Sequence, residues 1–110
     1  MINVSIVRDS SGFIWQFSIK GHAGYAGQGR DIVCAAASAT AYTAVGALGD
    51  LAGIENCHTE NDGFLFCSIP VEITEQQKQI AAIILETTVI GFKQIELEYK
   101  KFISVVEEEV

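Results

Sequence analysis

The chain has 110 residues, which suits a single domain over residues 1–110 with a core of its own. Hydrophobic residues make up 49% and charged residues 19%, a globular rather than a disordered composition. The net charge of −7, without a cluster of Lys or Arg, argues against direct nucleic-acid binding, because no basic surface exists to contact phosphates. An acidic protein of this kind favours basic partners.

The cysteine content and the N-terminus indicate a reducing compartment. Polar residues at positions 3, 8 and 9 interrupt the start of the chain before the apolar core of a signal peptide could form. We therefore expect a cytoplasmic protein with free thiols. The odd number of cysteines agrees with this expectation; they are Cys34, Cys57 and Cys67.

One uncharged stretch, residues 32–49, is nearly long enough to span a bilayer. It consists mostly of Ala, Ser, Thr and Gly, which gain little from burial in lipid. We interpret it as a helix packed closely within a soluble protein, and we expect no membrane partner.

The N-terminal part of the chain predicts a β-hairpin. Residues 2–7 and 13–20 both alternate between apolar and more polar positions, as strands do. Residues 9–12, Asp-Ser-Ser-Gly, predict the turn between them.

A glycine-rich segment and a helix follow. Residues 21–30 contain four of the ten glycines, which favours a loop over a regular element. Asp31 is a good helix N-cap, and the Ala-rich residues 32 to about 51 predict a helix that ends near Gly53.

The C-terminal half predicts a second hairpin, a second helix and a last strand. The hairpin comprises residues 55–60 and 64–69, joined by a turn with Asp-Gly at its tip. A capping box, with Thr74 at the N-cap and Gln77 at N3, begins a helix that runs to about residue 98. Residues 102–106 predict a strand before the acidic residues 107–109. The order ββαββαβ predicts an α+β fold of two layers, with two helices on a largely antiparallel sheet.

One pair of residues suggests catalysis. Cys34 occupies the third position of the predicted helix, where the free N–H groups and the positive end of the dipole stabilise a thiolate. His22 precedes a loop long enough to fold it back over the helix start, which is the arrangement of a nucleophile and its general base. Backbone N–H groups at the helix start are candidates for holding an oxyanion.

Each of these residues also has a plainer interpretation. Cys34 in an Ala-rich helix resembles a small buried hydrophobe, and His22 after a strand resembles a surface residue. Asp31 caps the helix, although its charge opposes a thiolate. Ser38 shares a helix face with Cys34, and it either contacts substrate or bonds to its own backbone.

The sequence argues against a cofactor. His22, His58 and the three cysteines show no C-x-x-C spacing, so a zinc site is not indicated. The glycine-rich segment lacks the Gly-Lys-Ser/Thr ending of a P-loop and has no Gly-x-Gly-x-x-Gly motif. We expect no metal and no cofactor, and Cys57 and Cys67 are interpreted as structural thiols of the second hairpin.

Residues 21–27, 29, 31–36 and 38 closely resemble the ribosomal-processing cysteine protease Prp family, in a G-H-A-x-x-A/G-x-x-x-x-D-I-V-C-A-A-x-S pattern. The resemblance extends over the whole chain in length and element order. It implies that Cys34 is the nucleophile and His22 the base, while Gly21, Asp31 and Ser38 match supporting positions.

The resemblance also implies a substrate and an assembly. The family's members are small cytoplasmic homodimers that remove a short N-terminal extension from the precursor of a large-subunit ribosomal protein. They cleave after aromatic residues, so an apolar pocket beside Cys34 is expected. Two alternatives stay open at this point. One is a non-enzymatic ribosome-associated assembly module, and the other is a phosphate-binding domain that uses the glycine-rich loop.

Overall fold

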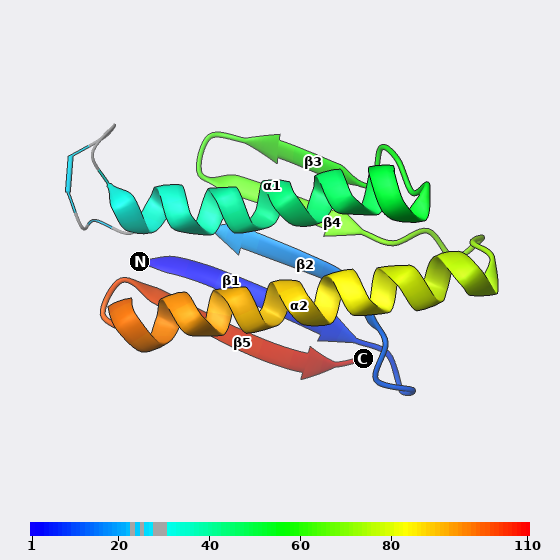
Figure 1. Cartoon of the computed structure of the whole chain (residues 1–110). Helices are drawn as coiled ribbons and strands as arrows, with labels where there is room; N and C mark the ends of the chain where they lie inside the picture. Colours follow the sequence, from blue (N-terminus) through cyan, green and yellow to red (C-terminus); the bar gives the residue numbers. More distant parts are fainter. Residues whose placement is uncertain (23, 25, 28–30) are drawn as a thin grey trace.

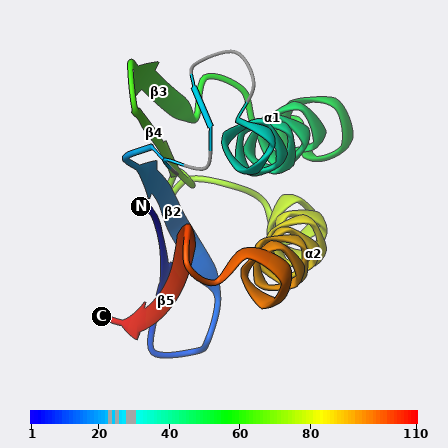
Figure 2. The same cartoon turned by 90° about the vertical axis from the view of Figure 1, so that its left-hand side faces the viewer.

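The computed structural model describes residues 1–22, 24, 26–27 and 31–110. Its strands form one sheet in the order β3-β4-β2-β1-β5, and both helices lie on the same face of that sheet (Figures 1 and 2). Only the pairing of β1 with β5 is parallel. The predicted two-layer α+β fold with the order ββαββαβ is therefore confirmed. The elements are β1 (Ile2–Arg8), β2 (Ile14–Lys20), α1 (Ile32–Ala52), β3 (His58–Asn61), β4 (Phe64–Ser68), α2 (Glu75–Tyr99) and β5 (Ile103–Glu109).

The turn between β1 and β2 is held by the side chain of Asp9. Its Oδ1 accepts hydrogen bonds from the backbone N–H and the hydroxyl of Ser11, at 2.8 and 2.6 Å. It also accepts from the N–H of Phe13 at 3.1 Å. Asp favours turns because its short carboxylate reaches backbone donors just ahead of it. The predicted first hairpin thus rests on a local, sequence-encoded network.

The core lies between the sheet and the two helices. The inner face of α1 consists mainly of alanines, and this allows α1 to pack closely on its neighbours. At the helix–helix contact, a Cβ atom added to Gly91 of α2 would lie 3.3 Å from Cγ2 of Thr40. Phe92 of α2 packs on Phe17 of β2, with ring centroids 6.2 Å apart. The buried residues of α1 are Val33, Ala37, Ala41, Ala44, Leu48 and Ala52.

Helix α1 is also long and apolar enough, by length and composition alone, to cross a membrane. Its buried residues recur every three or four positions along one side. That spacing is the pattern of a helix packed against a protein core.

Strand β3 begins at His58, three residues later than the sequence predicts. Gly53 caps α1 in the left-handed conformation, with φ of 68°, and the N–H of Ile54 donates to the carbonyl oxygen of Leu48. Asn56 also has a positive φ, 57°. Residues 53–56 therefore close the end of the helix before the strand can start.

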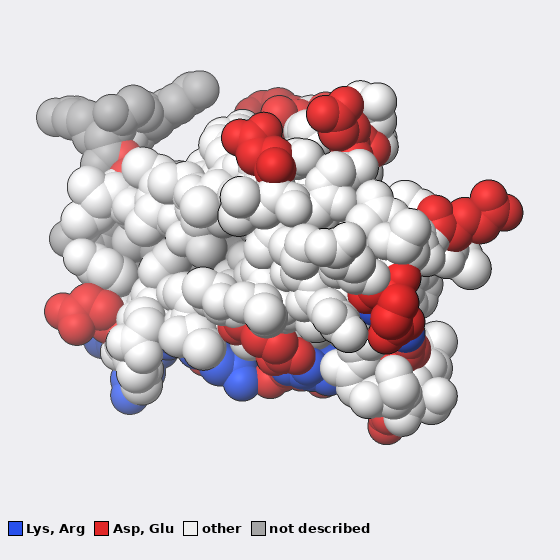
Figure 3. All heavy atoms as spheres, turned by 45° about the vertical axis from the view of Figure 1, so that its right-hand side comes forward, with Lys and Arg blue, Asp and Glu red and all other residues white. Residues whose placement is uncertain are grey.

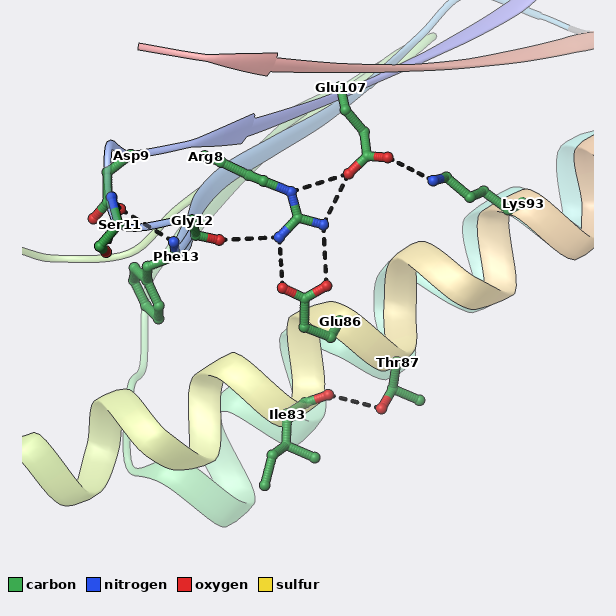
Figure 4. Close-up of polar contacts among 10 residues, drawn as sticks. All are labelled: Arg8, Asp9, Ser11, Gly12, Phe13, Ile83, Glu86, Thr87, Lys93 and Glu107. Atoms are coloured by element: carbon green, nitrogen blue, oxygen red, sulfur yellow. Dashed lines mark hydrogen bonds and ion pairs between the residues drawn. The ribbon is translucent and has the colours of Figure 1, made fainter.

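Strand β5 extends through the acidic residues that the sequence predicts to lie beyond it. It pairs with β1 over seven positions, from Ile2 opposite Ile103 to Arg8 opposite Glu109. The carboxylate of Glu107 accepts hydrogen bonds from Arg8 and Lys93, and Arg8 also pairs with Glu86 of α2 (Figure 4). These cations compensate the acidic charge and allow the strand to continue.

Candidate active site

Cys34 lies in the first turn of α1, where Asp31 caps the helix. Oδ1 of Asp31 accepts hydrogen bonds from the N–H groups of Val33 and Cys34, both at 3.0 Å. The thiol is half-buried, near the positive end of the helix dipole, which favours a thiolate. The expectation that helix-start N–H groups hold an oxyanion is wrong for these two, because the Asp31 carboxylate already engages them.

Gly21 leads from the end of β2 into His22. Its φ is 97°, and a Cβ atom at this position would lie 2.5 Å from the carbonyl oxygen of Met1. Its N–H donates to the carbonyl oxygen of Gly63 at 2.8 Å. Only glycine fits this backbone. The structure therefore gives Gly21 a positioning role, holding the start of the His22 segment against the turn between β3 and β4.

Two adjoining pockets surround Cys34 and His22. The first, called here the apolar pocket, has a volume of about 260 Å³, and the second, the loop-side pocket, about 530 Å³. Cys34 and His22 line both pockets although they come from different elements. The two pockets thus form one cleft across the start of α1. Four described residues are shared by the two linings: His22, Cys34, Ser38 and Asp62.

The apolar pocket has a hydrophobic wall beside Cys34. The family resemblance leads us to expect an apolar pocket next to the thiol, and this wall is the candidate for it. Its members come from β1, β2, α1 and β4: Ile2, Ile19, Ala37, Phe64 and Leu65. The loop-side pocket is lined by smaller residues, and Asp31 contributes to it: Gly24, Ala26, Asp31 and Ala35 accompany the four shared residues.

The turn between β3 and β4 is the part of the cleft that sequence reasoning missed. Asn61, Asp62 and Gly63 line the apolar pocket, and Asp62 lines both pockets. The Asp-Gly pair predicted the turn itself, but its contact with the His22 segment depends on β4 pairing with β2. Asp62 is thus an acidic residue that shares both pockets with His22, and the sequence did not reveal it as a neighbour.

Ser38 lies one turn after Cys34 and is exposed in both pockets. This position favours its contact with a ligand in the cleft over the plainer interpretation as a self-bonded helix serine. The sequence predicts a loop over residues 21–30, and of these residues 23, 25 and 28–30 lie outside the part of the chain that the structure describes.

The other thiols and the second histidine lie outside this cleft. Cys57 and Cys67 are buried, and their sulfur atoms are 3.4 Å apart without a disulfide. They lie in the second hairpin, as the sequence predicts. His58 lines a separate pocket at the far end of α1. Among the described residues, no group of three His, Cys, Asp or Glu side chains is arranged to hold a metal ion.

Comparisons with known proteins match nearly the whole chain. A sequence model of the family described as cysteine protease Prp matches residues 1–104. The ribosomal processing cysteine protease Prp of Bacillus subtilis is 32% identical over 102 residues, which cover 91% of each chain.

Two crystal structures of the essential ribosomal processing protease Prp from S. aureus share the fold. The complex with a covalently linked product peptide is 27% identical and has a TM-score of 0.82, covering 98% of this chain and 100% of that one. The complex with a substrate peptide is 26% identical, with a TM-score of 0.77 and the same coverage. The match of the family model over nearly the whole chain, with these relatives, means that the chain belongs to the cysteine protease Prp family.

Proposed function

We propose that this protease removes the N-terminal extension of a large-subunit ribosomal protein precursor, with Cys34 as nucleophile and His22 as general base. The observation that carries the proposal is that these two residues line the same two adjoining pockets. A thiol at a capped helix start that lines the same open cleft as a histidine is suited to peptide-bond hydrolysis.

The reaction follows from the chemistry of the pair. His22 takes the proton of the Cys34 thiol, and the thiolate attacks the scissile carbonyl carbon. The tetrahedral intermediate collapses to an acyl-enzyme as His22 gives the proton to the departing amine. His22 then takes a proton from water, which attacks the thioester. Collapse of the second intermediate expels the Cys34 sulfur, which regains its proton from His22, and releases the carboxylic acid, which loses its own proton to solvent.

The walls of the cleft support a specificity for aromatic residues. The hydrophobic wall of Ile2, Ile19, Ala37, Phe64 and Leu65 offers an apolar surface beside the thiol, where burial of an aromatic side chain is favourable. The S. aureus relatives were crystallised with substrate and product peptides. By analogy, the cleft of this chain receives the precursor as an extended segment.

We further propose that the protein acts in the cytoplasm as a homodimer and without direct contact to nucleic acid. Three large apolar side chains of α2 are spaced seven residues apart and mostly exposed: Ile83 at 70%, Ile90 at 60% and Leu97 at 74%. Figure 3 shows a broad area without charged side chains across the middle of one face. An exposed apolar stripe is unusual for a monomer, and a two-fold interface is its commonest partner.

The decisive experiment is incubation with the full-length precursor ribosomal protein from the same genome, followed by intact-mass measurement. We expect loss of the N-terminal extension with wild-type protein and none with Cys34→Ala. Alanine has the higher helix propensity, so the variant should keep its thermal stability. If a folded Cys34→Ala variant cleaves the precursor at a rate within tenfold of wild type, the assignment of Cys34 as the nucleophile is refuted. Tight binding of the precursor without cleavage would favour the assembly module instead.

A further inference from the structure

A hydrogen bond links α1 to the edge strand β3 at the end of the apolar pocket. The hydroxyl of Tyr42 donates to Oε2 of Glu60 at 2.7 Å. Tyr42 also lines the apolar pocket and is half-exposed, at 50%. The Glu60 side chain is 43% exposed, and its Oε1 lies 3.8 Å from Nε2 of His58, too far for a hydrogen bond. Glu60 therefore keeps acceptor capacity for a ligand in the cleft.

The position of Tyr42 relative to Cys34 sets a length scale. Cys34, Ser38 and Tyr42 follow one another at intervals of four, so they lie along one side of α1, and all three line the apolar pocket. Eight residues of helix advance about 12 Å. An extended peptide advances about 3.3 Å per residue, so a chain lying along this side reaches Tyr42 roughly four residues from the scissile bond.

The surroundings of this end of the cleft suit a hydrogen-bond donor. Asp62 lines the pocket, and Glu60 accepts a hydrogen bond from Tyr42 in its wall, whereas no Lys or Arg is among the described residues that line it. The Tyr42 hydroxyl uses its proton toward Glu60, so the pair presents an acceptor and an aromatic face. A peptide N–H group or a cationic side chain complements both features.

We propose that Tyr42 and Glu60 form a recognition subsite that binds a donor group of the substrate about four residues from the scissile bond. This inference rests on the proposed protease function and adds a determinant of substrate length and chemistry. The bridge between α1 and β3 holds the two side chains in place for this contact. The subsite acts on binding, so it contributes to KM rather than to the chemical step.

The test uses two conservative variants and two lengths of substrate. Tyr42→Phe removes the hydroxyl and keeps the ring, and Glu60→Gln removes the charge. Glu98→Gln is the matched control, since Glu98 is exposed on α2 and lines neither pocket of the cleft. We expect each subsite variant to lower kcat/KM roughly tenfold, mainly through KM, for peptides with six residues on each side of the bond. Peptides with two residues on each side should be cleaved equally by the variants and the wild type.

A second arm identifies the donor. The peptides carry Lys, norleucine or an N-methylated backbone at the fourth residue on either side of the scissile bond. A preference for Lys over norleucine indicates a cationic side chain as the donor, and a loss on N-methylation indicates a main-chain N–H. Affinities of the Cys34→Ala protein for the same peptides, with and without Glu60→Gln, give a readout independent of catalysis. Equal effects of Glu60→Gln on long and short peptides would overturn the subsite. Absence of all cleavage by the wild type would contradict the proposed function, while the affinity ratios would still decide the subsite.

Discussion

A Cβ atom added to Gly63 would lie 3.0 Å from Nε2 of His22 and 3.6 Å from both neighbouring ring carbons. The imidazole therefore packs directly on the backbone of the β3–β4 turn. Together with the hydrogen bond from the Gly21 N–H to the Gly63 carbonyl oxygen, this contact makes the turn a support for the proposed general base.

Gly63→Ala should lower kcat roughly tenfold, because the new methyl group displaces the ring by a few tenths of an ångström from its working position. The residue has φ of 74°, so the change also strains the backbone. Gly12→Ala is the matched control, since Gly12 has φ of 89° in a turn with no atom within 4 Å of the added Cβ. Steady-state kinetics and thermal denaturation of both variants separate the two effects. Equal losses of activity in both would mean that only strain matters.

His22→Ala should lower the rate of cleavage by roughly 10²–10⁴-fold, as expected when a general base is lost. His58→Ala serves as the control, because His58 lines a pocket that does not include Cys34. Initial rates over a range of pH values provide the measurement. A His22→Ala enzyme that keeps its rate and the same acid limb would point to a different base.

Cys34 should react with iodoacetamide near pH 7 well before the other two thiols. Cys34 is half-buried in an open cleft, whereas Cys57 and Cys67 are 9% and 1% exposed. The hydrogen bond with Cys57 and burial also raise the pKa of Cys67, which disfavours its thiolate. Peptide mass mapping after brief labelling gives the order of reaction, and denatured protein, in which all three thiols react, is the control. Earlier labelling of Cys57 or Cys67 would contradict the prediction.

The apolar stripe on α2 should form the dimer interface. Ile90→Glu introduces a charge at its centre and should shift the protein toward the monomer mass of 11.9 kDa. Val71→Glu is the control, because Val71 is 97% exposed and lies outside the helices. Sedimentation equilibrium at low micromolar concentration measures the masses. A wild-type protein at 11.9 kDa throughout would refute the dimer and leave the roles of Cys34 and His22 untouched.

Glu107→Gln should cost up to about 1 kcal/mol of stability, the range of a partly exposed ion pair. Hydrogen bonds from Lys93 and Arg8 lower the pKa of Glu107 below its ordinary value of 4.5. Its contribution is therefore complete above pH 4.5 and is lost as the pH falls through the folded-state pKa. Urea denaturation at several pH values should show the difference from wild type shrinking in acid. Glu109→Gln on the same strand is the control, and a difference that grows in acid would contradict the assignment.

Local signals account for the parts of the fold that the sequence predicted. Asp9 and the Thr74 capping box determine a turn and a helix start through hydrogen bonds between residues close in sequence. In the Asp62-Gly63 turn, Gly63 has a φ of 74°, a conformation that favours glycine. The loop between His22 and Cys34 led to the expectation that the two residues lie close together, and they do line the same pockets. Their roles as base and nucleophile came from the family resemblance and stay predictions.

The rest depended on contacts between distant segments. The extension of β5 through Glu107 requires Arg8, 99 residues away, and Lys93 of α2. The role of Gly63 and Asp62 as a wall of the cleft requires β4 to pair with β2. The apolar and polar pattern within β5 or within the β3–β4 turn does not tell which distant segment it will contact. The ion pairs of Glu107 and the place of the turn in the cleft wall are therefore known only once the sheet order is known.

The parallel pairing of β1 with β5 has a consequence for how the molecule reaches its native state. These strands join opposite ends of the chain, so the sheet has a high contact order and closes a large loop, which slows folding. During synthesis, β1 leaves the ribosome long before β5 is made. The outer edge of β1 therefore waits unpaired until β5 has been made.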